Sequence, residues 1–155
     1  MRKLSMNLLS STFRHYLSII VAGCLLFTSI VVQAEQLLKT DAFNIHYNAF
    51  NSSMLSPDIA KQYGIQRSSS VGVINISVLN NDDNAVTALI EGHAKNAISQ
   101  LSELKFKKIT EGTAIYYLAT FNFADKEELT FNLYIVPNGE TKNTKLSFLQ
   151  QFFVE

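Results

Sequence analysis

Apolar and polar residues alternate along most of the chain from residue 41 to the C-terminus. The alternation falls into seven short runs, at residues 43–48, 74–78, 86–95, 104–107, 113–123, 129–135 and 146–152. Successive side chains of a strand point to opposite faces, so a period of two predicts a strand with one buried face. The run at 113–123 is apolar on both faces, which predicts a central strand. The run at 104–107 carries two lysines, which is typical of an edge strand.

The segments between these runs have the composition of turns. They are rich in Asn, Asp and Gly, and lie at residues 80–84, 111–112, 124–127 and 137–140. Asn and Asp bond to nearby backbone groups, and Gly adopts left-handed angles without steric cost. Short strands with frequent turns predict an all-β fold, an antiparallel immunoglobulin-like β-sandwich of about seven strands.

One short helix is predicted in the long connection between the first two strands. Ser56 is a suitable N-cap, Pro57 suits the first helical position, and Asp58 suits the positive end of a helix. Gly64 provides a stop signal. The spacing allows two helical turns at most.

The first 34 residues differ from the rest of the chain. Arg2, Lys3 and Arg14 precede and flank an apolar run from Leu17 to Val32, and small side chains end it at Val32-Gln33-Ala34. A basic start, an apolar stretch and an A-x-A-like end indicate a secretory signal peptide. We therefore predict a signal peptide at residues 1–34 and one β-sandwich domain at 35–155.

Two alternatives to a cleaved signal remain open. Val21-Ala22-Gly23-Cys24 resembles a lipobox, and cleavage before Cys24 would leave a lipidated N-terminus. An uncleaved membrane anchor is the other alternative, although a transmembrane helix needs about 20 apolar residues and this run is shorter. Export as a soluble protein, with no stable membrane span after processing, is the favoured interpretation.

Charge and cysteine content restrict the partners of the processed chain. Removal of residues 1–34 leaves ten basic against 13 acidic residues, without a basic cluster. This argues against nucleic acid, whose binding depends on clustered Lys and Arg. Cys24 is the only cysteine, so the chain forms no internal disulfide and the domain depends on its core for stability.

No catalytic, cofactor-binding or metal-binding motif is recognisable. The region from 35 to 155 has two histidines, His46 and His93, each on the polar side of an alternating run. They are interpreted as ordinary exposed residues, and the alternative is a metal site that they share with carboxylates. No catalytic residue, metal ligand or cofactor is therefore predicted.

The segment from residue 46 to 68 is the most unusual in composition. It combines aromatic and amide side chains with the predicted helix, and long loops often carry function. Its candidate recognition residues, together with one tyrosine of the fifth run, are His46, Tyr47, Asn48, Asn51, Tyr63, Arg67 and Tyr116. The alternative is a structural loop that Ile59, Tyr63 and Ile65 hold against the sandwich. Since adjacent strand residues face opposite ways, Tyr117 is predicted in the core and Tyr116 outside it.

Four stretches resemble a known family. They are residues 46–52, residues 63–65 with 67–68, residues 75–78, and Glu-Gly-Thr-Ala-Ile-Tyr-Tyr-Leu-Ala-Thr-Phe at 111–121. They are similar to the DUF4426 family of short exported Gram-negative proteins, a domain of unknown function. The resemblance implies an immunoglobulin-like sandwich and a periplasmic location. It implies no activity, so it transfers no site residue.

These observations favour a non-enzymatic periplasmic binding or accessory module. It would act through its loops or through a sheet edge, since an exposed edge can accept another chain as an added strand. The expected partner is an envelope protein or a glycan, and the oligomeric state stays open. The alternatives are an enzyme whose site is assembled from residues distant in sequence, and a structural subunit of an envelope complex.

Overall fold

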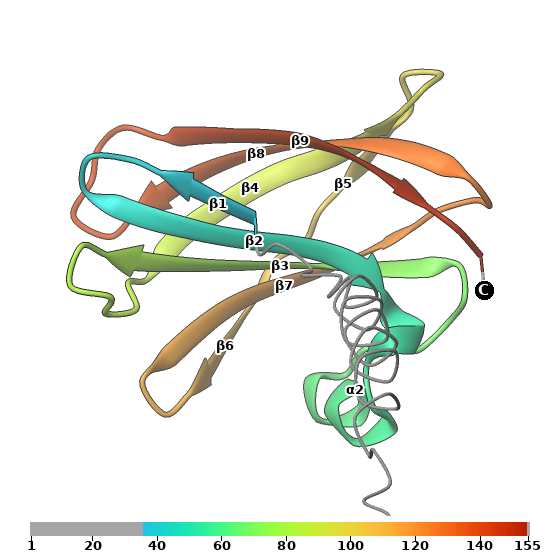
Figure 1. The fold of residues 1–155 in the computed structure, drawn as a ribbon, viewed down its shortest axis with the longest axis horizontal. Coiled ribbons are helices and arrows are strands. Elements are labelled where there is room, and N and C mark those ends of the chain that lie inside the picture. The colour runs from blue at the N-terminus through green and yellow to red at the C-terminus, as the bar shows by residue number, and fades with distance from the viewer. Residues whose placement is uncertain (1–35, 155) are drawn as a thin grey trace, which may run out of the picture. The chain divides into compact units, whose positions relative to one another are not determined.

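Two antiparallel sheets make up the fold of residues 36–154, which are the residues that this computed structural model describes (Figure 1). The strand order of sheet A is β1 (Gln36–Lys39), β2 (Phe43–Asn51), β3 (Val71–Asn80), β7 (Ala114–Asn122) and β6 (Lys107–Glu111). The strand order of sheet B is β5 (Leu101–Glu103), β4 (Ala88–Asn96), β8 (Glu127–Pro137) and β9 (Thr144–Phe152). The predicted all-β sandwich is confirmed.

The core lies between the two sheets. The long strands contribute every second residue, as the alternation predicts, and fully buried apolar side chains of the core come from both sheets: Ile45, Ile74, Ile76 and Val78 from sheet A, and Phe131, Leu133 and Ile135 from sheet B. Phe131 lies among aromatic neighbours, with ring centroids 5.0 Å from Phe121 and 4.8 Å from Phe148. Aromatic pairs at these distances add to the stability that burial provides.

The predicted central position of the run at 113–123 agrees with the structure. β7 lies between β3 and β6, and Tyr117 on its inner side is 5% exposed. The Tyr117 hydroxyl accepts a hydrogen bond of 2.6 Å from the backbone N–H of Ala88. β6 is an edge strand of sheet A and begins with exposed lysines, which discourage pairing with a further chain.

The strand count and one strand position differ from the prediction. Residues 36–154 contain nine strands rather than about seven, since β1 and β5 have only four and three residues and show no long alternation. The run predicted at 104–107 meets a strand only at Lys107, where β6 begins. Leu104 and Phe106 belong to the core or pack against it, in the segment where the chain crosses from sheet B to sheet A. The crossing buries alternate side chains without strand pairing.

The connection between β2 and β3 contains the helical structure of the described region. A 3-10 turn, η1 (Ser52–Met54), is followed by the helix α2 (Pro57–Tyr63). The Ser56 side chain accepts a hydrogen bond from the backbone N–H of Ile59, and Gly64 ends the helix with φ of 70°. The predicted cap, first residue and stop of this helix are therefore confirmed.

The predictions for the N-terminal segment concern residues outside the described range. The signal peptide at 1–34 and the lipobox at Cys24 lie outside the described residues. Between residues 36 and 154, no helix has the length and apolar character that a membrane span requires.

Candidate functional site

The connection between β2 and β3 folds back over the outer face of sheet A. Ser52, which is fully buried, fixes the base of this connection. Its hydroxyl accepts a hydrogen bond of 2.9 Å from the backbone N–H of Ser68 and lies 3.1 Å from the carbonyl oxygen of Gln66, to which it donates. Arg67 donates to the carbonyl oxygen of Ser53 at 2.7 Å. The two ends of the connection are thus held together at the start of β3.

The far end of the connection is fixed to the edge strand β6. The side chains of Gln62 and Tyr63, at the end of α2, both donate hydrogen bonds to Oε1 of Glu111. In the other direction, the ammonium group of Lys107 donates to the backbone carbonyl oxygen of Tyr63 at 3.2 Å. The connection therefore reaches from the end of β2 to β6, and the C-terminal end of α2 is attached to β6.

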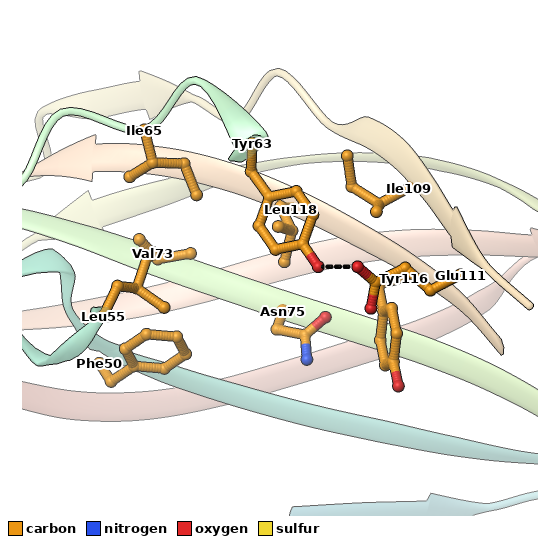
Figure 2. Close-up of a pocket in the computed structure, with 10 residues that line it drawn as sticks. All are labelled: Phe50, Leu55, Tyr63, Ile65, Val73, Asn75, Ile109, Glu111, Tyr116 and Leu118. Carbon is orange, nitrogen blue, oxygen red and sulfur yellow. Dashed lines mark hydrogen bonds between the residues drawn. The ribbon is translucent and has the colours of Figure 1, made fainter. Parts of the chain in front are cut away.

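A cleft of about 210 Å³ lies between this connection and the sheet (Figure 2). Its floor consists of outward-facing residues of four strands, namely Phe50, Val73, Asn75, Ile109, Glu111, Tyr116 and Leu118, and its cover consists of Leu55, Tyr63 and Ile65. Val73 is fully buried although it lies on the outer face of sheet A. The connection thus encloses an apolar cleft outside the main core.

The cleft contains few polar groups, namely the Asn75 amide, the Glu111 carboxylate and the hydroxyls of Tyr63 and Tyr116. Oδ1 of Asn75 is buried and has no hydrogen-bond donor among the described residues. The Tyr63 hydroxyl donates to the Glu111 carboxylate, as the dashed line in Figure 2 shows. This hydrogen bond, with a smaller contribution from burial, raises the pKa of Tyr63 above its ordinary value of 10.0. At neutral pH the hydroxyl therefore keeps its proton and directs it to Glu111.

Four of the seven candidate recognition residues lie on this face of sheet A. Tyr63 and Tyr116 line the cleft itself. Asn48 is exposed and pairs with Asn75 across β2 and β3, and His46 is the next outward-facing residue of β2. The structure therefore brings together residues that the sequence separates by up to 70 positions.

The other three candidate residues lie elsewhere. The Tyr47 ring packs toward the core, with its centroid 4.8 Å from that of Phe148. Asn51 is 8% exposed, and its side chain donates to the carbonyl oxygen of Phe153. Both residues follow the inward-facing alternation of β2, so neither lies on the outer face. Arg67 is exposed, and it donates to the base of the connection as described above.

The 46–68 segment is a loop held against sheet A that also covers a cleft. Tyr63 and Ile65 face the sheet and help to cover the cleft, as expected of a loop held against the sandwich. Ile59 is 37% exposed, so it is only partly covered. The loop is held together at its base, attached to β6 through Gln62 and Tyr63, and leaves space between these two points.

Sequence reasoning did not identify most of the cleft floor. Asn75 and Glu111 were visible only as a polar strand residue and a turn residue. A signal existed in β3, because Val71 and Val73 occupy the same face as the polar Asn75. Apolar residues on both faces of a strand indicate that something covers each face.

The two histidines do not form a shared site. His46 lies on the outer face of sheet A, whereas His93, which pairs with Asn132 and Glu103, lies on the outer face of sheet B. The body of the sandwich separates them. In the part of the chain that the structure describes, His, Cys, Asp and Glu side chains form no group of three or more that could hold a metal ion.

Comparison with known proteins gives a family match and a set of similar folds. The family model of the domain of unknown function DUF4426 matches residues 38–155. A crystal structure of a DUF4426 family protein from Pseudomonas aeruginosa is similar to this chain, with 34% sequence identity and a TM-score of 0.72. The similarity covers 80% of this chain and 98% of that one. No curated protein matches the chain.

Two structures of FetP from uropathogenic Escherichia coli share the fold at low sequence identity. FetP recombinantly expressed in the periplasm is 9% identical, with a TM-score of 0.56 over 77% of this chain and 94% of that chain. A copper-bound variant of FetP is 8% identical, with a TM-score of 0.57 over 79% and 97%. At this identity the likeness concerns the fold alone.

Proposed function

The chain belongs to the DUF4426 family, and we propose that it is a non-enzymatic binding module of the bacterial periplasm that holds an apolar group of its ligand in the cleft beneath α2. The observation that carries this proposal is the cleft itself. It is concave and mostly apolar, and it has a few convergent polar groups, which are the general features of ligand sites in proteins.

The chemistry of the cleft supports binding rather than catalysis. Its titratable side chains are Glu111, Tyr63 and Tyr116, and two of these are hydrogen-bonded to each other. Neither histidine lines the cleft, and no serine, cysteine or lysine does. The one hydroxyl of this lining that is paired with a base is that of Tyr63, beside Glu111, and its raised pKa keeps it protonated rather than ionised as a nucleophile.

A periplasmic location has separate support. The first 34 residues have the basic start, the apolar run and the small-residue end of a signal peptide. FetP, whose fold is similar, was recombinantly expressed in the periplasm. A partner that this module meets there would be an envelope protein or a glycan that presents an apolar group.

An NMR titration of the purified protein with phenethyl alcohol tests the proposal. This neutral probe has one ring and a short arm, and it should shift the amide signals of Val73, Asn75 and Leu118. Substitution of Ile109 by Phe places a larger side chain at the cleft wall and should weaken binding roughly tenfold or more. The matched control is Leu149→Phe on the outer face of sheet B, which should leave binding unchanged.

Two results would contradict the proposal. One is the absence of any shift at the cleft amides up to the solubility limit of the probe. The other is equal binding by the wild type and Ile109→Phe, provided that both variants keep the free energy of unfolding expected of a folded domain. In either case the cleft would not be the binding site.

A further inference from the structure

We propose that the ligand of the cleft carries an amine, as a protonated ammonium group, next to its apolar body. This inference rests on the proposed function, because it names the class of ligand that the same cleft takes. It follows from three features of the lining: its size, its surplus of hydrogen-bond acceptors and its single carboxylate.

The size of the cleft sets the apolar part of the ligand. A dry cavity of about 150 Å³ lined by Leu, Ile and Phe accommodates benzene. The cleft has about 210 Å³, with Phe50, Leu55 and Ile65 at one end. One ring or one branched aliphatic group therefore fits, together with an arm of two or three atoms. A long acyl chain does not.

The acceptors of the cleft require a ligand that donates hydrogen bonds. Oδ1 of Asn75 is buried on the floor without a donor among the described residues, and an unsatisfied buried acceptor is costly. Oε1 of Glu111 already accepts from Tyr63 and Gln62, which leaves Oε2 for a ligand. The proton of the Tyr63 hydroxyl is directed to Glu111, so its oxygen presents lone pairs. An ammonium group supplies three donors to such a lining.

The charge of the cleft distinguishes an ammonium group from a neutral donor. Glu111 is the only charged side chain of the lining, in which neither Lys nor Arg occurs. Lys107 contacts the backbone of Tyr63 and not its ring hydroxyl. The rings of Phe50, Tyr63 and Tyr116 add faces that attract cations. A carboxylate or phosphate ligand would meet repulsion from Glu111 and find no cationic donor in the lining.

Figure 2 shows the order of the apolar and polar groups across the cleft. Asn75 projects from the middle of the floor, and Glu111 and Tyr116 lie to one side of it, with the apolar end on the other side. A ligand with its ring near Phe50 and Leu55 would therefore place the end of a short arm between Asn75 and Glu111.

Three probes of matched shape test the inference, namely phenethylamine, phenethyl alcohol and phenylacetate. They share one ring and a short arm, and at neutral pH they differ in charge. NMR titrations of the purified protein should give a dissociation constant about tenfold lower for the amine than for the alcohol, and the weakest binding for phenylacetate. Added salt should reduce the advantage of the amine, because the carboxylate is at an exposed rim.

Two variants separate the roles of the acceptors. Glu111→Gln should raise the dissociation constant of the amine about tenfold and leave that of the alcohol nearly unchanged. Asn75→Ala should weaken the amine and the alcohol by similar factors, since both donate to Oδ1. Glu140→Gln, in the turn between β8 and β9, is the control for loss of an exposed carboxylate and should change neither.

The possible outcomes distinguish this inference from the proposed function. If the alcohol binds in the cleft and the amine binds no more tightly, the amine class is wrong and the binding function stands. If none of the three probes shifts the cleft amides, both proposals are rejected. If Glu111→Gln alters the fold, the ratio of amine to alcohol affinity in the wild type and its salt dependence still decide the matter.

Discussion

The outer faces of the two sheets differ in what covers them. On sheet A, Val73 is fully buried beneath the connection that contains α2. On sheet B, the outward-facing Leu89, Tyr134 and Leu149 are 62%, 41% and 56% exposed. The polar pair Asn132 and Ser147 separates Leu149 from Tyr134, whereas Leu89 lies near Tyr134 because it pairs with Val136.

This difference shows where a second, smaller cavity can form in a sandwich. Both sheets direct their inner residues to the common core, and tight packing leaves little space there. Above sheet A, the cover is a loop attached at two points, at Ser52 and at Glu111. Between its base and its attachment to Glu111 the loop does not follow the sheet surface, and the cleft is the space that remains. In the described region no such loop covers Leu89, Tyr134 and Leu149 of sheet B.

The largest expected effect is the difference in free energy of unfolding between two variants, one with a new charge on the outer face of sheet A and one with a new charge on that of sheet B. Val73→Asp would place a carboxylate among Phe50, Leu118 and the covering loop, so it should lower the free energy of unfolding by about 3–5 kcal/mol, the cost of an uncompensated buried charge. Leu149→Asp, on the outer face of sheet B, should change it by no more than about 0.5 kcal/mol. Urea unfolding of both variants measures the difference.

A similar loss of stability in the two variants would contradict the comparison. It would mean that the outer face of sheet B is also covered, for example by a second copy of the chain. Repeating the unfolding at several protein concentrations would detect that case, because the stability of an oligomer depends on concentration.

A substitution at the base of the connection should have an intermediate effect on the free energy of unfolding. Ser52→Ala would leave the backbone N–H of Ser68 without its acceptor in a buried position, which costs about 1–3 kcal/mol. Ser147→Ala is the matched control, because the Ser147 hydroxyl donates to Asn132 on the exposed face of sheet B. Its substitution should cost no more than about 0.5 kcal/mol. Urea unfolding again measures both, and equal losses would show that Ser52 does not fix the connection.

The sequence contained enough information for the fold class and for the helix. Period-two alternation located the long strands, and Ser56, Pro57 and Gly64 defined α2 correctly, because caps and stops act through neighbouring residues. β1 and β5 were missed because strands of four and three residues carry too little pattern. The segment at Leu104 looked like a strand because its alternate residues enter the core, although the backbone there changes sheets.

The candidate site was only partly predictable, for a physical reason. Tyr63 and Tyr116 stood out because aromatic residues in a long loop and on a doubly apolar strand are unusual. Glu111 and Asn75 did not, since their roles depend on tertiary contacts. Glu111 accepts from residues 48 and 49 positions away, and Asn75 is enclosed only when the connection folds over β3. Alternation assigns a residue to a face, but it does not reveal what lies above that face.

The smallest expected effect concerns the bond between Tyr63 and Glu111, which attaches the cover to β6. Its hydrogen bond raises the pKa of Tyr63, so the folded state holds this proton more tightly than the unfolded state. The resulting contribution to stability is complete below a pH of about 10 and is lost as the pH rises through the folded-state pKa. Glu111→Gln should bring the pKa of Tyr63 back toward its ordinary value.

Ultraviolet titration isolates this effect. The difference between the titration curves of the wild type and Tyr63→Phe gives the ionisation of Tyr63 alone, and the same difference in the Glu111→Gln background should have a lower midpoint. Tyr134→Phe serves as the control for loss of one tyrosine, because Tyr134 lies on the outer face of sheet B, away from Glu111. An unchanged midpoint would show that Glu111 does not hold the Tyr63 hydroxyl, and the cover would then be attached to β6 only through Gln62 and Lys107.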